Sequence, residues 1–439
     1  MSCKRGSVFL AGGYLVLIAL LLAVFFLGVT WDPPPLRRVA YGAGCVAYVL
    51  FSCQLLLSAR LRWLDRWVSL DRLYVLHGVL AAVALVVVYT HGILVTWGHE
   101  GESSLKEAGE IARLLFVLAT VGGAVLLGTV WLERIPGYAG LRQGIRRVFH
   151  LRYHWCVWLH NVAVVGVTVM LVHILLLSPP TLLPFKVVCV LLYACCVGTH
   201  LYHRLLRQRF LPAWRCQEAI AVDGAVHTLR FRPGSGGGMQ SEAGQFAYLS
   251  LGLPGLREPH PFTIAGNRDG EIEFDIKASG DWTRELAAVG EGSEARLHGP
   301  FGAFTLEDVE PACPLLLVAG GIGITPFLAM VRELAATGSS RDVRLVWSVG
   351  AAPDAFARDE LDGLASRLPG LQVTVWVTHG PGGKGWLDAA AFATLLDAAD
   401  LEWTEVFLCG PPEFMTAMTR TLLGMGLPAA RLHAERFGY

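Results

Sequence analysis

The first half of the chain is built from long apolar runs separated by short charged links. Six such runs lie at about residues 8–29, 40–58, 73–97, 111–132, 156–177 and 183–203. A helix needs about 20 apolar residues to cross the hydrocarbon core of a bilayer, and each run has roughly that length. The sequence therefore predicts a bundle of six transmembrane helices.

Composition separates this half from the rest of the chain. The 439 residues are 54% hydrophobic and 16% charged, which is too apolar for an ordinary soluble protein. Beyond about residue 209, charges, glycines and prolines return to the density of a globular protein. The net charge of zero and the lack of a basic tract argue against nucleic-acid binding. No CxxC pair occurs among the 10 cysteines, so a structural zinc is not expected.

The charges of the links predict an orientation. The links at 59–72, 133–154 and 203–209 are basic, and the link at 98–110 is acidic. The positive-inside rule then places the N-terminus, the basic links and the second half in the cytoplasm. The first run could be a signal peptide, but no small-residue cleavage site follows it, so we expect a retained helix. The third and fifth helices then run in the same direction.

Two histidine pairs lie on these parallel helices: His77 and His91 on the third, and His160 and His173 on the fifth. Spacings of 14 and 13 residues define two depths about 21 Å apart. The alternative, four unrelated polar residues, is less attractive because ionisable groups inside membranes are rare and usually functional. The pattern predicts two haems, each held by one imidazole from each helix. The shorter spacing requires a bend or a π-bulge in the fifth helix.

Other basic residues near the runs have weaker assignments. We expect His150, His154, His200 and His203 to face solvent or lipid headgroups. Arg60, Arg62 and Arg72 are candidates to contact the propionates of one haem, and Arg37 or Arg38 those of the other. Anchoring to lipid phosphate is an equally good reading for each arginine.

The second half begins with strand-like runs at 225–233, 244–251 and 270–279, which predict a small antiparallel barrel. The segment His260, Pro261, Phe262 and Thr263 offers an aromatic face and a hydroxyl group to a flavin. The segment Gly280-Asp281-Trp282-Thr283 begins a predicted helix that could take a pyrophosphate. Each segment could also be an ordinary turn or helix cap.

A glycine-rich turn follows the apolar strand at 314–319. Gly320, Gly321 and Gly323 permit close backbone approach, and Thr325 and Pro326 start a helix that faces a phosphate. Strands at 342–350, 371–380 and 405–409 complete a predicted doubly wound parallel sheet. Cys409, Gly410, Pro411 and Pro412 then lie at the strand ends that line a crevice. The simplest reading of Cys409 is a small buried hydrophobe, which does not exclude it from flanking a nicotinamide.

These features together resemble the ferric reductase and NADPH oxidase superfamily, in its compact bacterial form. The resemblance implies a six-helix domain over 1–209 with two b-type haems, ligated by His77 and His160 and by His91 and His173. It also implies a ferredoxin–NADP reductase-like part, with an FAD-binding barrel over 213–308 and an NAD(P)H-binding domain over 313–439.

The same resemblance assigns the motifs of the second half. HPFT, from His260 to Thr263, would hold the flavin, and the Gly280–Thr283 motif its pyrophosphate. GGIGITP, from Gly320 to Pro326, would hold the nicotinamide dinucleotide, and Cys409 would lie at the nicotinamide. Tyr439, or alternatively Phe437, would stack on the flavin. Gly350 stands where relatives often have an arginine for the 2′-phosphate of NADPH. Arg358 is a possible substitute, which leaves NADPH favoured over NADH.

The implied function is electron transfer across the cell inner membrane. Cytoplasmic NAD(P)H would reduce FAD, and single electrons would pass through both haems to an acceptor on the outer side. We expect dioxygen, reduced to superoxide, as the acceptor. A ferric chelate and a periplasmic partner protein are the alternatives, and a non-catalytic channel or scaffold is a contrasting reading. No obligate protein partner is evident from the sequence.

Overall fold

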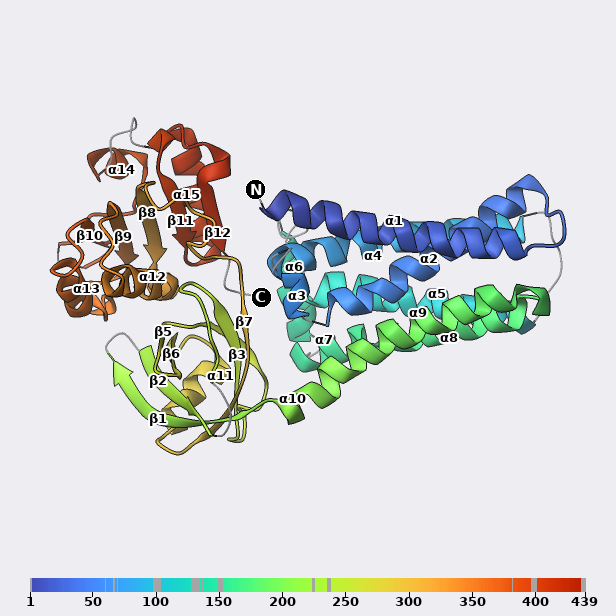
Figure 1. Ribbon diagram of the computed structural model, residues 1–439, viewed down its shortest axis with the longest axis horizontal. Helices are drawn as coiled ribbons and strands as arrows, with labels where there is room; N and C mark the ends of the chain where they lie inside the picture. The colour runs from blue at the N-terminus through green and yellow to red at the C-terminus, as the bar shows by residue number, and fades with distance from the viewer. Residues whose placement is uncertain are drawn as a thin grey trace. The chain divides into compact units, whose positions relative to one another are not determined.

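A computed structural model describes residues 2–59, 61–65, 68, 70–97, 104–127, 135, 137–148, 153–222, 226–234, 238–380, 382–395 and 401–435. The chain divides into two compact units, Met1–Arg209 and Phe210–Tyr439. Figure 1 shows the first unit as helices and the second as two sheets with their helices.

Long helices form the first unit. They are α1 (Ser2–Gly28), α2 (Pro35–Leu57), α4 (Leu70–Thr96), α5 (Ser104–Gly122), α8 (Val162–Leu177) and α9 (Leu183–Leu201), with shorter elements α3 (Arg62–Asp65), α6 (Tyr138–Val148), α7 (Tyr153–His160), η3 (Pro180–Leu182) and α10 (Arg207–Phe210). The π-helical turns η1 (Gly123–Leu127) and η4 (Tyr202–Leu206) extend α5 and α9. Within the described residues, six stretches are long and apolar enough to cross a membrane, as the sequence predicts.

Aromatic packing joins these helices. The rings of Phe51 on α2 and Phe116 on α5 stack with centroids 3.7 Å apart. Tyr48 donates a hydrogen bond of 2.7 Å from its hydroxyl to the carbonyl oxygen of Cys189 on α9. A Cβ atom at Gly166 of α8 would lie 2.9 Å from the Phe116 ring, so glycine is required for this approach.

The fifth apolar stretch is interrupted between its two histidines. Helix α7 ends at His160, and α8 begins at Val162. The Asn161 amide N–H donates to the carbonyls of both Val157 and Trp158 at 3.1 Å. Such a tightened turn changes the rotation between successive residues. The interruption lies between the two histidines whose spacing of 13 residues predicts a bend or a π-bulge.

The second unit begins with a seven-stranded antiparallel sheet in the order β4-β3-β7-β1-β2-β6-β5. Its strands are β1 (Ala213–Val222), β2 (Val226–Pro233), β3 (Phe246–Leu251), β4 (His260–Thr263), β5 (Gly266–Arg268), β6 (Glu271–Lys277) and β7 (Glu294–Phe301). The short helices α11 (Asp281–Arg284) and η6 (Glu285–Ala288) precede β7. The predicted antiparallel sheet is confirmed, although the sequence analysis missed β1, β5 and β7.

A five-stranded parallel sheet follows, in the order β10-β9-β8-β11-β12. Its strands are β8 (Leu315–Gly320), β9 (Val343–Val349), β10 (Leu371–Val377), β11 (Glu405–Cys409) and β12 (Leu432–Glu435). The helical segments of this sheet domain are η7 (Gly321–Ile324), α12 (Thr325–Ala336), η8 (Ala352–Asp354), α13 (Arg358–Ala365), α14 (Ala389–Leu395), α15 (Pro412–Gly424) and η10 (Ala429–Arg431).

Strand β8 is buried on both faces. Leu315 and Leu317 belong to one apolar cluster with residues of α12 and α13, and Leu316 and Val318 to another with residues of α14 and α15. Helices therefore cover both faces of the sheet, which is the predicted doubly wound arrangement.

Arg332 links the two sheets of this unit. From α12, its guanidinium donates 2.7 Å to the Ala265 carbonyl oxygen and 2.8 Å to Glu273 of β6. It also holds Glu360 of α13 through two hydrogen bonds of 2.7 and 2.8 Å. Charge-assisted bonds of this kind are stronger than neutral ones, so Arg332 fixes the barrel against the parallel sheet.

Candidate cofactor sites

The first histidine pair comes together in the helical unit. The rings of His77 on α4 and His160 on α7 lie 5.7 Å apart between centroids, at an interplanar angle of 67°. A metal–imidazole bond is about 2 Å long. Two rings on opposite sides of one metal ion therefore have centroids about 6 Å apart. The His77 and His160 rings are therefore close enough to hold one metal ion between them.

Hydrogen bonds define the orientation of two of the rings. His160 Nδ1 lies 2.9 Å from the carbonyl oxygen of Ala119, and His91 Nδ1 lies 2.7 Å from that of Ala40. A carbonyl only accepts, so each Nδ1 carries the proton. In a neutral ring Nε2 then keeps a free lone pair, which is the arrangement typical of a metal-ligating histidine.

Glycines face three of the four rings, a feature that the sequence analysis missed. An added Cβ atom would lie 2.9 Å from His91 at Gly44, 2.8 Å from His173 at Gly109 and 2.7 Å from His160 at Gly123. Glycine inside a helix costs about 1 kcal/mol relative to alanine. Gly44 and Gly123 lie inside predicted helices, and this is the sequence signal that could have indicated a close approach, whereas Gly109 falls in the predicted link 98–110.

The described residues contain no group of three or more histidine, cysteine, aspartate or glutamate side chains that could hold a metal ion.

The expectation that His200 faces solvent or headgroups is wrong. His200 is buried, and its Nδ1 lies 3.1 Å from the Ser58 hydroxyl. The hydrogen bond satisfies the ring inside the bundle. Arg38 forms an ion pair with Asp32 and donates to the Pro33 carbonyl at 3.0 Å. Arg60, His150 and the side chain of His154 lie outside the described residues.

The HPFT segment forms β4, which pairs with β3 so that Thr263 lies opposite Phe246. The Trp282 ring packs beside this strand, with centroids 4.8 Å from His260 and 5.4 Å from Phe262. Trp282 Nε1 is buried and has no hydrogen-bond partner among the described residues. Pro261 is exposed. The sequence motifs at 260–263 and 280–283 thus meet, and they leave one polar atom suited to a bound group.

Thr283 closes the turn that starts α11. Its hydroxyl oxygen accepts the amide N–H groups of Ser279 and Gly280, both at 2.9 Å. The hydroxyl also donates to the Gly280 carbonyl at 3.1 Å. Thr283 therefore shapes this turn, and its own hydrogen-bonding capacity is largely used within it.

Glycines bring the two turns of the parallel sheet into contact. Strands β8 and β11 are neighbours, with Ala319 opposite Cys409. A Cβ atom at Gly323 would lie 2.5 Å from the Cys409 carbonyl oxygen, and one at Gly410 would lie 3.0 Å from the Gly320 Cα. The GGIGITP and CGPP segments therefore form one surface at the carboxyl ends of the strands, where ligands of such sheets bind.

The remaining residues of these turns support the backbone. Gly321 has a φ of +53°, and its carbonyl oxygen accepts a 2.8 Å hydrogen bond from Trp347 Nε1. Thr325 is buried and donates 3.2 Å to the Ile322 carbonyl, and Pro326 follows it in the first turn of α12. Pro411 precedes α15 as its cap residue.

Cys409 is fully buried. Burial and the nearby Glu435 raise the pKa of its thiol well above the usual value. Because the reactive form of cysteine is the thiolate, this side chain is not an activated nucleophile. The burial of Cys409 fits a small buried hydrophobe, and its place beside a nicotinamide stays a prediction.

The end of β9 carries opposite charges. A Cβ atom at Gly350 would lie 2.8 Å from Asp354 Oδ2, which accepts the Ala351 N–H at 3.0 Å. Arg358 begins α13 and pairs with Asp362 at 3.1 Å. The sequence analysis did not single out Asp354, which follows the second strand of the parallel sheet, where an acidic side chain is a candidate for ribose binding. Tyr439 and Phe437 lie outside the described residues.

Comparisons with known proteins identify the second unit. Residues 219–307 match the model of an FAD-binding domain, and residues 317–420 that of an oxidoreductase NAD-binding domain. The ferredoxin–NAD(P)(+) reductase component of the naphthalene 1,2-dioxygenase/salicylate 5-hydroxylase systems of a Ralstonia species is 30% identical over 226 residues. The match covers 49% of this chain and 67% of that protein.

Other relatives match over a smaller share of their length. The toluate 1,2-dioxygenase electron transfer component of Pseudomonas putida is 28% identical, over 43% of this chain and 57% of its own length. The glycine betaine monooxygenase reductase subunit of Pseudomonas aeruginosa is 29% identical, over 51% and 63%. The chain therefore spans about 60% of the length of these two proteins.

A flavohemoglobin structure from Malassezia yamatoensis has a TM-score of 0.50 and 20% identity, over 92% of this chain and 96% of that one. This likeness concerns the fold alone. Through its second unit, the chain belongs to the FAD- and NAD-binding oxidoreductases of the ferredoxin–NAD(P) reductase type.

Proposed function

We propose that this protein is a transmembrane oxidoreductase that transfers electrons from NAD(P)H, through FAD and two b-type haems, to an acceptor across the membrane. The observation that carries the proposal is the His77–His160 pair, with ring centroids 5.7 Å apart, in a chain that also has an FAD- and NAD-binding module. A free-standing flavin reductase has no need of such a pair.

Separate groups of residues would bind the haems, the flavin and the dinucleotide. His77 and His160 would hold one haem and His91 and His173 the other, with Ala119 and Ala40 fixing two of the rings. Residues 260–263 and Trp282 would bind the flavin, and the surface formed by Gly320, Gly323 and Gly410 would take the dinucleotide. When bound, FAD converts a two-electron donor to one-electron transfer, and the haems carry electrons through the bilayer.

The basic links support the proposed orientation, with the N-terminus and the second unit in the cytoplasm of a cell whose inner membrane holds the six helices. The acceptor then lies on the outer side. We favour dioxygen, reduced to superoxide, since a six-coordinate haem can pass an electron to oxygen without binding it. A ferric chelate and a partner protein are the competing acceptors.

The proposal is tested by measuring NADPH oxidation by the purified protein under two conditions. One is in air, and the other is under argon with ferric citrate. We expect superoxide-dismutase-sensitive reduction of cytochrome c in air. Turnover only with ferric citrate would instead identify a ferric reductase. The variants H91A and H173A should each lose about half of the haem and keep FAD reduction by NADPH. Retention of both haems would refute the ligand assignment.

A further inference from the structure

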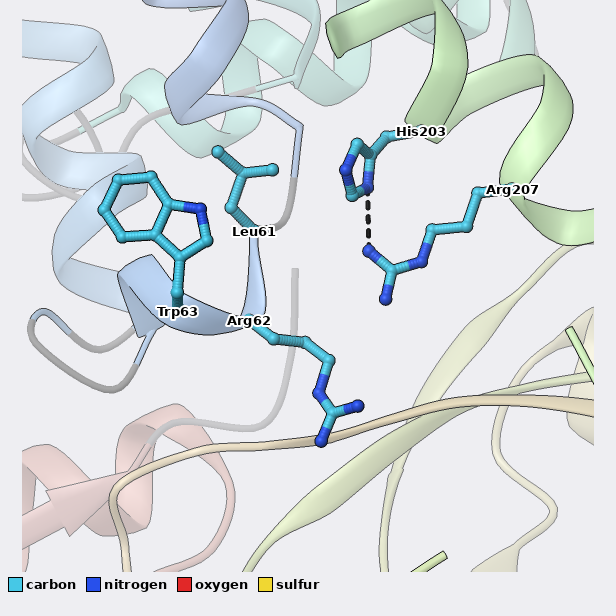
Figure 2. A pocket seen from close by; sticks show the side chains of 5 residues that line it. All are labelled: Leu61, Arg62, Trp63, His203 and Arg207. Atoms are coloured by element: carbon cyan, nitrogen blue, oxygen red, sulfur yellow. Dashed lines mark hydrogen bonds between the residues drawn. The ribbon is translucent and has the colours of Figure 1, made fainter. Parts of the chain in front are cut away.

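A basic cavity of about 460 Å³ lies in the helical unit and has no part in the proposed electron path. Leu61, Arg62 and Trp63 line it from one side, and His203 and Arg207 from the other. Figure 2 shows these two walls, with the Arg207 guanidinium turned toward the His203 ring. Its volume is in the range of small-molecule sites.

Every polar side chain that lines the cavity carries at least one hydrogen-bond donor. Arg207 Nη1 donates to His203 Nδ1 at 2.8 Å. This bond uses the Nδ1 lone pair, so the neutral ring carries its proton on Nε2. No lining residue is acidic. Burial and the charge of Arg62 lower the pKa of Arg207, as expected for a guanidinium group that lies near a second positive charge.

The cavity lies where two candidate membrane spans end. The span that contains α2 ends at Leu57, four residues before Leu61, and the span that contains α9 and η4 ends at Leu206, directly before Arg207. Trp63 is 55% exposed, and tryptophan is enriched at the membrane–water interface. The cavity therefore combines cationic donors, an interfacial aromatic ring and a buried leucine.

We propose that this cavity binds the phosphate headgroup of an anionic phospholipid. Arg62 and Arg207 supply the positive charge, and basic pockets between transmembrane helices take such headgroups. Guanidinium groups match the geometry of phosphate oxygens, while Leu61 and Trp63 suit the adjoining glycerol and acyl chains. The inference rests on the membrane placement proposed above but not on the haems.

The test is lipid binding by the detergent-purified, delipidated full chain, measured by native mass spectrometry. Palmitoyl-oleoyl phosphatidylglycerol (POPG) and palmitoyl-oleoyl phosphatidylcholine (POPC) are added in separate titrations. We expect POPG to bind more tightly than POPC. The variant R62Q/R207Q should bind POPG about tenfold more weakly. The control R142Q/R215Q removes the same charge elsewhere and should bind like the wild type.

The other outcomes overturn the proposal. Equal binding of POPG and POPC, or unchanged POPG binding by R62Q/R207Q, would show that the cavity does not select an anionic lipid. Displacement of POPG by millimolar inorganic phosphate would identify a free-phosphate site. Loss of haem absorbance from R62Q/R207Q with normal POPG binding would assign the arginines to a haem carboxylate.

Two further measurements distinguish loss of lipid binding from misfolding and from failure of the proposed function. The single variant R62Q changes an exposed residue, and it should weaken POPG binding even if the double variant misfolds. Flavin fluorescence and haem absorbance on the same preparations report the proposed function separately. A protein without haem that still selects POPG would refute the haem proposal and retain this one.

Discussion

His160 shows how a single residue is prepared for a role in a site. Its Nδ1 donates to the Ala119 carbonyl, its ring packs against Gly123, and the helix is interrupted at the next residue, Asn161. Each contact restricts the imidazole to one orientation, in which Nε2 points away from the hydrogen bond. A ligand held in this way requires little reorganisation when it binds a metal.

Substitution of Gly123 tests this view. In G123A the new Cβ atom would meet His160 Nδ1 at 2.7 Å, so the ring must move or the hydrogen bond must break. We expect the haem content to fall by about half, or the midpoint potential of one haem to shift, with FAD content unchanged. The haem-to-FAD ratio and a redox titration measure both effects.

Gly198 provides the matched control, because it also lies in a long apolar helix but an added Cβ would have no neighbour within 4 Å. G198A should keep the haem content and both potentials. A G123A protein with two haems of unchanged potential would contradict a positioning role for this contact.

Asp354 leads to a prediction about the nucleotide. Its carboxylate lies beside Gly350 at the end of β9, where a carboxylate binds the ribose hydroxyls of NADH and repels the 2′-phosphate of NADPH. The only basic residue that the sequence suggested there, Arg358, is paired with Asp362. We therefore expect Asp354 to favour NADH, whereas the sequence prediction favours NADPH through Arg358.

We expect D354N to raise the ratio of kcat/KM for NADPH to that for NADH by about tenfold. Ferricyanide serves as the acceptor, so that the assay reports flavin reduction alone. D359N, an exposed change on α13, is the control and should leave the ratio unchanged. A wild-type protein that strongly prefers NADPH would contradict the role assigned to Asp354.

At the scale of elements, β6 carries two carboxylates with opposite behaviour. Burial opposes ionisation of Glu273, but the charges of Arg332 and Arg230 prevail and lower its pKa. Burial raises the pKa of Asp275 to about 6, although it accepts a 2.6 Å hydrogen bond from Thr228. Native Asp275 thus holds its proton to a higher pH than the unfolded chain does.

The raised pKa of Asp275 makes the stability of the second unit depend on pH. Between about pH 4 and pH 6 the native state binds the proton more tightly, so the contribution of Asp275 to stability falls as pH rises. Above pH 6 the cost amounts to about 3 kcal/mol. D275N should therefore unfold at a higher temperature than the wild type at pH 7.5, and the difference should be clearly smaller at pH 4.5. Flavin release on heating measures the transition, and an equal difference at both pH values would contradict the assignment.

At the scale of the whole molecule, the elements that the sequence predicted best are those with continuous apolar runs. The apolar runs and the strands β8 to β11 are continuous and fully or largely apolar, so composition alone located them. Strand β1 mixes Arg215 and Glu218 into its alternation and contains a bulge, and β12 has four residues at a sheet edge. Neither has a period that a single sequence reveals.

The candidate sites also contain some features that the sequence predicts and others that it does not. Motifs that act within a few residues, such as HPFT and GGIGITP, were recognisable because their chemistry is local. The contacts Gly44–His91 and Gly109–His173 join residues on different helices, and Trp282 meets Phe262 through the barrel fold. These depend on tertiary packing, which spacing along the chain does not contain.

The most direct test of the proposed electron path is an absorbance spectrum of the purified full chain under argon before and after NADPH or NADH is added. The account predicts one FAD and about two haems per chain, a Soret band, and reduction of both flavin and haem by the nucleotide. A protein whose flavin is reduced by the nucleotide but which shows no haem absorbance would contradict the central claim.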